Sequence, residues 1–587
     1  MDLILDAILI VVVLGVTAIC ATPIAFYMAP TSRWLTRLVL SFVLGFALIE
    51  LAGILSAFLG VNCIVLQGCV VLVGIGLFLL NWKKITGCGD RRLDREDKMA
   101  LAFASLYLFI CLFFFDRIII WMGGDSLAHG EIIRMLLDGR PVPVSIPPFG
   151  SYWEYYPKGF HLFCYPWAKI FPFLNVLRTI PILITAMTMI LYYSIVRELG
   201  RRDESIYALI LAGFVFSAQY SNIIWAGYPT ITSEMFLVAA LLSVLVNKRL
   251  LPIFLLGVLF SHERMMFIAG GVLLSWMAVT YFGRYRHIIW ANPAAKIIIA
   301  GAVAGIAAGI VISVHIPHFF VSVLTDQSLA SSYAARWFPA FLSLFGAVIA
   351  FFRRDRLDLL ALSWAGAVSV IVLLADAGPL EFVGTADRLL LDLYLPLSLL
   401  AASALAKMEQ AVPSVRTGFI LVLILCGSLF MGSVFSSYLG SWAIPEEDYK
   451  AIMWLGEQNY SDVVCINLDE TGAWVYPLTG MLTANHRMVP ETVPIKLDII
   501  KKIGTVPGSF EVLKTLKALK GPGFNRSLIF VSNVSLSRPE YVPPFLESSG
   551  EFPAVNLKFP RNSYDMIYSQ GAYIFGFPKG AFSSKSR

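Results

Sequence analysis

The sequence predicts a polytopic α-helical membrane protein with about fourteen transmembrane helices, followed by a small soluble α/β domain. Of its 587 residues, 58% are hydrophobic and only 14% are charged, whereas a soluble domain carries about 25% charged residues. Long apolar runs recur up to residue 437, and beyond 438 the apolar runs shorten to the length of strands. Because so small a share of charged residues cannot cover a water-facing surface, we expect lipid to cover much of the chain.

The candidate spans are apolar runs that approach the roughly 20 residues a bilayer crossing needs. They are 3–29, 38–60, 62–81, 99–121, 174–197, 205–222, 231–246, 250–262, 265–283, 295–314, 338–352, 358–375, 389–405 and 417–437. The first run starts at Leu3 without a basic segment before it, so we expect an anchor and not a cleaved signal.

Lysine and arginine mark one set of alternate loops, which we expect to be cytoplasmic. These basic loops lie around 33–37, 83–98, 197–202, 248–249, 284–286, 353–356 and 407–416. Residue 1 and everything after 437 are then outside the cell membrane. The net charge of +6 is modest, and no nucleic-acid partner is expected.

Three regions follow from this pattern. Residues 1–98 form extra N-terminal spans and a basic loop, 99–437 form the main transmembrane core, and 438–587 form the outer α/β domain. The expected strands are 463–467, 527–532 and 572–577, with helical stretches at 444–459 and 509–520. The eight cysteines include no CxxC pair and predict no disulfide framework.

The first outer loop, 122–173, carries most of the chemistry-bearing residues. Asp125 directly follows a span and two glycines, and His129 comes four residues later, on the same face of a helix. Residues 127–138 read as an amphipathic helix along the membrane surface, and a second surface helix follows Lys158. A carboxylate at this depth can act as a general base, although Asp is also a good helix N-cap.

Other polar residues of this loop allow more than one interpretation. His129 can be a buried, satisfied histidine, and Glu154 and His161 can be packing residues. Together with Asp125 they could also bind a divalent metal, but their spacing matches no strong metal signature, so no metal ligand and no cofactor is assigned. Aromatic residues in the same loop can line a sugar site or form an interfacial belt: Tyr152, Trp153, Tyr155 and Tyr156.

Four stretches resemble the GT-C superfamily of membrane glycosyltransferases. DSLAHGEIIRMLLDG and YYPKGFHLFCYPWAKIF look like the two surface helices of its first outer loop, where an acid stands at the start. GTADRLLLDLYLPLSLLAA at 384–402 is similar to a late segment in which an arginine opens a span near the donor phosphate. The segment that starts EEDYKAIMWLGEQNYSDVVCIN is similar to the soluble domain of archaeal and bacterial members.

The chain also departs from two branches of that superfamily. It has no WWDYG sequence, as the oligosaccharyltransferase branch would, and Asp125 is followed by Ser126 instead of a second acid, unlike the protein O-mannosyltransferase branch. Spans 1–3 look like an addition before the usual core. The resemblance therefore leaves the acceptor open.

The resemblance implies transfer of one sugar from a polyprenyl-phosphate donor to a glycan, lipid or protein acceptor on the outer face, with inversion. Asp125 would deprotonate the acceptor hydroxyl, and fixed cations would stabilise the departing phosphate. Arg388 is the first candidate cation, followed by Arg264 and Lys158, while His129, Glu154 and His161 would add substrate contacts. Each arginine could instead pair with a nearby acid: Glu263 for Arg264, and Asp387 or Asp392 for Arg388.

Two other functions stay open. A transporter or lipid flippase would place charges inside spans near the membrane midplane, and Asp116 and Arg117 in the fourth span keep this alternative alive. A non-catalytic scaffold that presents the outer domain is the third possibility, against which the acids and histidines of one outer loop argue.

Overall fold

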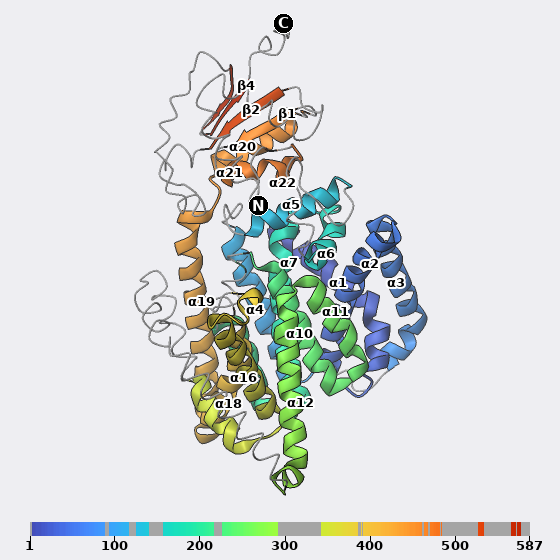
Figure 1. The fold of residues 1–587 in the computed structure, drawn as a ribbon, viewed down its shortest axis with the longest axis vertical. Helices are drawn as coiled ribbons and strands as arrows, with labels where there is room; N and C mark the ends of the chain where they lie inside the picture. The colour runs from blue at the N-terminus through green and yellow to red at the C-terminus, as the bar shows by residue number, and fades with distance from the viewer. Residues whose placement is uncertain are drawn as a thin grey trace.

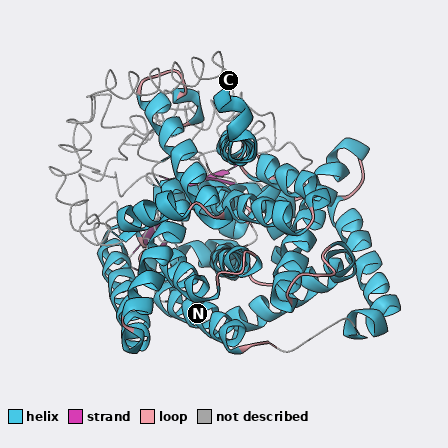
Figure 2. Cartoon of the chain, turned by 90° about the horizontal axis from the view of Figure 1, so that it is seen from below, coloured by secondary structure: helices cyan, strands magenta, loops and turns pink. Residues whose placement is uncertain are grey.

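The computed structural model describes most of the helical region and part of the outer domain. Its residues are 3–87, 93–116, 125–139, 157–215, 223, 226–291, 342–384, 389, 391–458, 460, 463–467, 470–481, 483, 526–532, 565–570 and 572–576. Figure 1 shows a bundle of long helices with a small sheet-containing domain at one end. Figure 2, seen from below, shows the helices end-on and side by side.

Eight described helices are long and apolar enough to cross a membrane, by length and composition. Each coincides with a predicted span. They are α1 Leu3–Met28, α2 Trp34–Leu59, α3 Cys63–Gly87, α4 Arg95–Asp116, α7 Phe173–Glu198, α10 Tyr228–Val246, α16 Arg356–Asp376, and the segment 391–411 that ends in α18 Tyr394–Ala411.

The other predicted spans are shorter or lie outside the described residues. Helices are present at α8 Arg202–Ile210, at α12 Arg264–Ala291, at 342–353 and at α19 Arg416–Trp442, while 295–314 is not described. At 250–262 the prediction of a full crossing is wrong. Helix α11, Leu251–Ser261, has 11 residues, so at 1.5 Å per residue it covers only about half of a roughly 30 Å hydrocarbon core.

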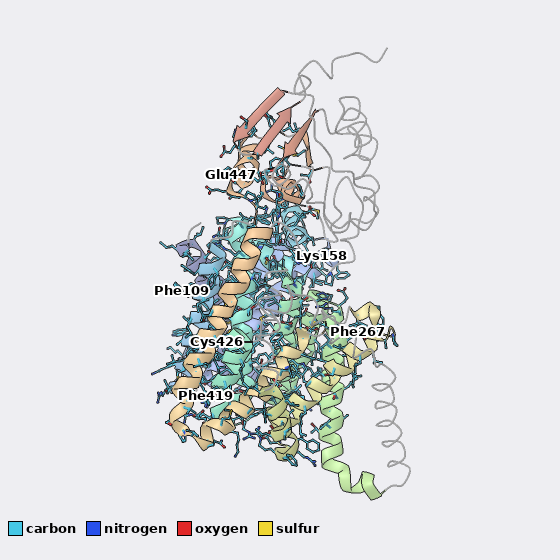
Figure 3. All side chains as sticks on the ribbon, turned by 90° about the vertical axis from the view of Figure 1, so that its left-hand side faces the viewer. Phe109, Lys158, Phe267, Phe419, Cys426 and Glu447 are labelled. Atoms are coloured by element: carbon cyan, nitrogen blue, oxygen red, sulfur yellow. The ribbon has the colours of Figure 1, made fainter. Side chains whose placement is uncertain are left out.

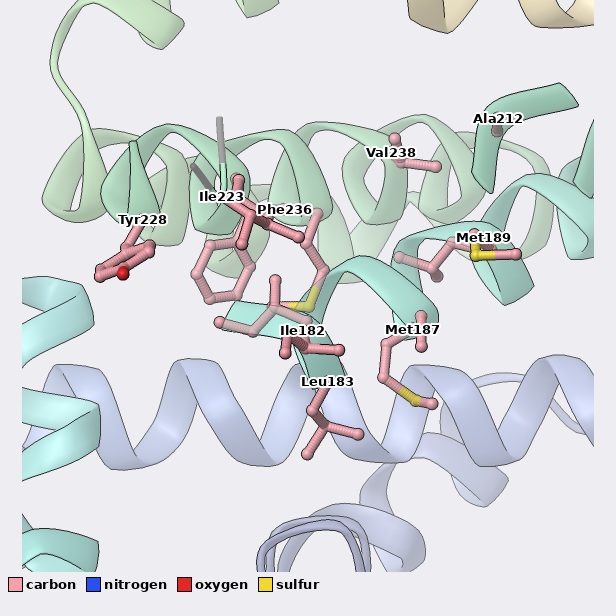
Figure 4. Packing of buried hydrophobic residues seen from close by; sticks show 14 of the residues in the cluster. Ile182, Leu183, Met187, Met189, Ala212, Ile223, Tyr228, Phe236 and Val238 are labelled. Atoms are coloured by element: carbon pink, nitrogen blue, oxygen red, sulfur yellow. The ribbon is translucent and has the colours of Figure 1, made fainter. Parts of the chain in front are cut away.

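Side chains on the outside of the bundle are apolar, as a lipid-covered surface requires. Phe109 and Phe267 are 62% and 48% exposed, and Cys426 is exposed too (Figure 3). Inside the bundle, α7 is the central helix, and its most apolar stretch is buried on all sides. Figure 4 shows Ile182 of α7 next to Phe236 of α10 in this packed interior.

The basic loops meet at one end of the bundle. Arg33 Nη2 lies 2.6 Å from Asp94 Oδ2, and Arg197 contacts the same carboxylate. Further contacts extend this end to the later loops: Arg353 to Glu204 at 2.8 Å, Arg416 to Glu96 at 3.0 Å, and Asn247 to the Met28 carbonyl at 2.7 Å. The predicted grouping is therefore confirmed for the loops in these contacts, while the loop at 284–286, whose side chains are not described, and the cytoplasmic location stay predictions.

Helices α1 to α3 pack directly against the rest of the bundle. Buried Asp6 of α1 accepts hydrogen bonds from Asn175 at 2.7 Å and Thr179 at 2.9 Å, and pairs with Arg178, all on the first turns of α7. Gln67 of α3 donates to the Leu162 carbonyl at 2.8 Å. The boundary at residue 98 stays a prediction, but these helices support the end of the bundle where the candidate site lies.

The region after α19 contains a four-stranded mixed sheet in the order β1-β2-β4-β3. Strand β1, Val463–Asn467, is parallel to β2, Arg526–Val531, and β4, Ala572–Gly576, is antiparallel to both β2 and β3, Asp565–Gln570. Strands occur at the three predicted places, and helix α20, Glu446–Glu457, occurs where a helix was expected. Strand β3 was not predicted because its sequence DMIYSQ is half polar, and 509–520 lies outside the described residues.

Candidate active site

Two short helices of the first outer loop build one wall of the candidate site. These are α5, Asp125–Leu137, and α6, Gly159–Ala168, which pack against each other below the C-terminal domain (Figure 1). The helix predicted at 127–138 is present as α5, and its position along a membrane surface stays a prediction, but its polar residues do not form an open face. Glu131 on that face is fully buried, and Gly130 lies next to Trp474 and Pro477 of the C-terminal domain.

Helix α22, Val475–Thr479, packs on α5 and explains this burial. Tyr476 joins an apolar cluster with Ala128 and Ile132, and its hydroxyl donates to Asp138 Oδ2 at 3.0 Å. Asp138 in turn lies 3.0 Å from Arg134 Nε. The polar positions of α5 therefore serve to dock the C-terminal domain, which places that domain directly over the helix that begins with Asp125.

Asp125 is the first residue of α5 and is partly exposed. Within the described part of the chain it makes no hydrogen bond and no ion pair, although its charge acts on His129 and on Tyr228. As a residue of the first helical turn it also benefits from the positive end of the helix dipole. A carboxylate in this state remains open to an incoming hydroxyl group.

His129 and His161 form a buried pair behind Asp125. His129 Nδ1 lies 2.9 Å from His161 Nε2, and His129 Nε2 lies 2.9 Å from the Ala226 carbonyl oxygen. Burial lowers the pKa of His129 to about 4, against the opposing charge of Asp125, and burial also puts the pKa of His161 well below its ordinary value. A neutral His129 that donates from Nε2 must accept at Nδ1, so both ring nitrogens are in use. This arrangement favours the interpretation of His129 as a satisfied buried histidine that positions α5.

The carbonyl that holds His129 belongs to a residue in an unfavourable backbone conformation. Ala226 has φ of 59°, in the left-handed region that costs an L-residue roughly 1–2 kcal/mol, and it is fully buried. Such strain persists where the surroundings determine it, often at functional sites. Here it turns the Ala226 carbonyl toward the histidine pair.

Lys158 directly precedes α6 and is 7% exposed, at the end of the bundle that faces the sheet domain (Figure 3). The next residue, Gly159, lies so close to the buried carboxyl group of Glu50 in α2 that any side chain there would collide with it. Glu50 also accepts from the Ser261 hydroxyl at 3.3 Å, and Ser261 is three residues before Arg264. Glu50, which the sequence analysis missed, thus connects the Lys158 and Arg264 segments.

Arg264 begins α12 and contacts the start of α10. Its Nη2 lies 3.5 Å from Thr230 Oγ1, and its Nε is buried without an acceptor among the described residues. The alternative pairing with Glu263 is wrong, since the Glu263 side chain is 59% exposed and its carboxylate lies 4.0 Å from His262. Arg264 makes no ion pair in the described part of the chain, so its guanidinium group can accept an anion.

The first turn of α10 connects the two halves of the site. The Tyr228 ring lies 5.4 Å from the His129 ring and interacts electrostatically with Asp125. Two residues later, Thr230 contacts Arg264. Tyr228, Thr230 and the acids Glu234 and Asp392 were not predicted as site residues. An acid inside an apolar run was the available signal for Glu234.

Several predicted site residues lie outside the described residues. They are Glu154, Arg388 and the aromatic residues Tyr152, Trp153, Tyr155 and Tyr156. The described residues include no group of three or more His, Cys, Asp or Glu side chains that could hold a metal ion. The divalent metal that was considered at Asp125, His129, Glu154 and His161 therefore has no support in the described part of this set.

Comparison with known proteins gives structural neighbours only. No family model and no curated protein matches the chain. Two similar structures are oligosaccharyltransferases of Archaeoglobus fulgidus. One is AglB with an inhibitory peptide and a dolichol-phosphate, at 12% identity and TM-score 0.41 over 75% of this chain and 70% of that one. The other is a complex with zinc and sulfate, at 14% identity and TM-score 0.42 over 81% and 72%.

A third neighbour is ArnT from Cupriavidus metallidurans in the apo state. It is 12% identical, with TM-score 0.49, over 82% of this chain and 98% of that one. These neighbours belong to the GT-C superfamily that the sequence resembles. At these TM-scores the similarity assigns no role to any residue of the chain, and the functional case rests on the site itself.

Proposed function

We propose that the chain is a membrane glycosyltransferase that moves one sugar from a polyprenyl-phosphate donor to an acceptor hydroxyl. The observation that carries this proposal is the presence of two available groups of opposite charge at one end of the bundle. Asp125 has no hydrogen-bond or ion-pair partner among the described residues, and Arg264 has no ion-pair partner there. Arg264 contacts Thr230 and Asp125 interacts electrostatically with Tyr228, and both partners belong to the first turn of α10.

In this proposal Asp125 takes the proton of the acceptor hydroxyl as that oxygen attacks the anomeric carbon of the donor sugar. The bond from that carbon to the phosphate oxygen breaks, and the electron pair leaves with the polyprenyl phosphate. Attack from the side opposite the phosphate inverts the anomeric centre. A lipid-linked donor enters sideways from the bilayer, which suits a site at the end of the helix bundle.

The negative charge that grows on the phosphate would be stabilised by Arg264, together with Arg388 and Lys158. A guanidinium group offers several donors in a fork that matches phosphate oxygens. A Cβ atom on Gly384 would lie 3.6 Å from Arg264 Nη1, and Arg388 follows Gly384 by four residues in the sequence. Arg388→Lys should therefore weaken donor use less than Arg388→Ala, because Lys keeps the charge and loses the fork.

The test of the base is Asp125→Asn, which keeps the size of the side chain and removes its basicity. Turnover should fall by about 10²- to 10⁴-fold while polyprenyl phosphate still binds. The assay is transfer from a radiolabelled polyprenyl-phosphate sugar in detergent, and the matched control is Asp203→Asn, an exposed acid at the other end of the bundle. Wild-type turnover by Asp125→Asn would show that another acid, with Glu154 the next to test, is the base.

Transport is the second candidate, and one observation favours it. Glu50 and Glu234 are fully buried acids inside spans, where transporters place proton-carrying groups. The two functions separate in sealed proteoliposomes. Sugar transfer without net movement of the lipid donor between leaflets supports the glycosyltransferase, and movement without transfer supports a flippase.

A further inference from the structure

Two buried acids lie next to Arg264 and have no place in the chemistry above. Glu234 is on α10 one turn after Thr230, and Asp392 is in the short helix η5, Leu391–Leu393, just before α18. They are 0% and 1% exposed. The Tyr394 hydroxyl donates to Glu234 Oε2 at 2.8 Å, and Asp392 is two residues before Tyr394, so the two acids lie close enough to interact electrostatically.

The hydrogen bonding of Asp392 indicates how many protons this pair holds. Both of its carboxyl oxygens are buried without a donor among the described residues, although the Glu234 carboxyl group lies against them. Two ionised carboxylates are both acceptors and repel each other strongly in a buried site. One proton between them removes the repulsion and supplies the missing donor.

The charges then balance against Arg264, the cation that acts on both acids. A carboxyl pair that shares one proton carries one negative charge, which compensates one guanidinium group. The compensation is electrostatic, since neither acid makes an ion pair with Arg264 in the described part of the chain. The fork of Arg264 therefore keeps its hydrogen-bonding capacity.

We propose that Glu234 and Asp392 are positioning residues that share one proton and hold the Arg264 guanidinium group in place for the phosphate of a lipid-linked donor. This inference rests on the proposed function for the identity of the anion, and on the burial of both acids and the unsatisfied oxygens of Asp392 for the shared proton. The pair compensates the partly buried Arg264 without using up its hydrogen-bond donors. A direct carboxylate–Arg264 ion pair would compete with the phosphate.

The first experiment tests the shared proton without any substrate. In the infrared spectrum of the purified wild type, the carbonyl stretch of a protonated carboxylic acid should be present. It should lose the contribution of this pair in both Glu234→Gln and Asp392→Asn, because the amide supplies the donor and the remaining acid stays ionised. Spectra of either variant that match the wild type overturn the shared proton.

The second experiment measures binding of polyprenyl phosphate without sugar to the protein in nanodiscs. Each single amide variant keeps one negative charge and one hydrogen bond, so affinity should fall by only about 3-fold. The double variant leaves the partly buried Arg264 without a compensating charge, and affinity should fall by about 100-fold. The exposed residue Lys407 on α18 offers the control Lys407→Ala, which should bind like the wild type.

The outcomes separate the inference from the proposed function. A double variant that binds no worse than the product of the two single effects overturns the positioning role. If the double variant does not fold, the Tyr394→Phe variant replaces it, since it loosens Glu234 alone and should lower affinity while leaving the infrared signature in place; unchanged affinity would then count against the role. If even the wild type does not bind polyprenyl phosphate, the proposed donor fails, while the infrared result stands independently.

Discussion

At the end of the bundle where the basic loops meet, Arg33 and Arg197 both contact Asp94, and Arg353 contacts Glu204 and Asp358. At the opposite end, Arg264 reaches the hydroxyl of Thr230 and no carboxylate among the described residues. Arg264 is partly buried like these arginines, yet it has no direct ion pair in the described part of the chain. It differs in this also from Arg178 and Arg134 near its own end, which pair with Asp6 and Asp138.

This difference separates arginines that hold the fold from an arginine that is available to a ligand. A buried charge is costly unless it is paired and hydrogen-bonded. The basic-loop end meets this requirement with reciprocal caps and shared carboxylates, such as Asp94 and Asp97, which accept from each other's backbone N–H groups at 2.8 and 3.2 Å. At the opposite end, donors of Arg264 stay unused, which is the condition expected of a group that binds an anion.

Lowering the pH should have the largest effect, because it should weaken the end that holds His129 before it weakens the basic-loop end. His129 is neutral in the folded state, with a pKa lowered to about 4 by burial, so unfolded protein binds more protons below the ordinary value of 6.5. Stability is therefore complete above about pH 6.5 and is lost as the pH falls toward 4, by up to about 3 kcal/mol for this residue. At the basic-loop end, burial raises the pKa of Asp94, but a hydrogen bond from the Asp97 backbone and the charges of Arg197 and Arg33 outweigh burial and lower that pKa. Its contribution is therefore lost only at more acidic pH.

Melting temperatures in detergent from pH 7.5 to 4.5 test this order. The His161→Gln variant should have a flatter profile than the wild type between pH 6.5 and 4.5, because His161 is also kept neutral by burial. A wild-type melting temperature that is constant over that range would contradict the buried neutral pair.

Removing a cation from the network at the basic-loop end should affect stability and leave catalysis intact. Arg197→Ala leaves Asp94 with one fewer partner and should destabilise the protein by about 2 kcal/mol. That is below the 3–5 kcal/mol of a fully buried pair because Asp94 is 33% exposed. Thermal unfolding gives the stability, and turnover per folded molecule should equal that of the wild type. A specific loss of turnover would remove the distinction between the two ends.

The smallest expected effect concerns the backbone strain of Ala226, near the candidate site. Ala226→Gly removes the penalty of a φ of 59° and should change the free energy of unfolding by about 1 kcal/mol or less, since the more flexible unfolded chain offsets part of the gain. Turnover should drop slightly if the strain fixes His129 through the Ala226 carbonyl. Ala21→Gly, in the buried interior of α1, is the matched control and should only destabilise. Equal destabilisation by both changes would show that Ala226 carries no strain.

The sequence predicted the long spans well because each is a continuous apolar run with its own signal. It also predicted which loops lie together and that the outer strands begin near 463, 527 and 572. It placed Asp125 at the start of a helix beside His129, which depends only on local spacing. These features are set by neighbouring residues and by the bilayer.

Features that depend on contacts between distant segments could not be predicted. Tyr476 packs on α5 from more than 300 positions away, so the polar face of α5 looked solvent-facing in the sequence. The proximity of Asp392 to Glu234, 158 positions earlier, could not be predicted either, and the pairing of Asp392 with Arg388 stays a prediction because Arg388 lies outside the described residues. Glu263 looked like a partner for Arg264, yet its side chain turns toward solvent and His262.

The most direct test compares anion binding at the two ends of the bundle. Polyprenyl phosphate should be titrated against wild-type protein in nanodiscs and against Arg264→Ala, Arg197→Ala and Arg249→Ala, the last an exposed control at the basic-loop end. Loss of a charge-assisted contact predicts that Arg264→Ala weakens binding by about 10- to 100-fold, while folded Arg197→Ala and Arg249→Ala bind like the wild type. Wild-type affinity in Arg264→Ala, or an equal loss in Arg197→Ala, would contradict the assignment of the end that holds Arg264 as the phosphate site.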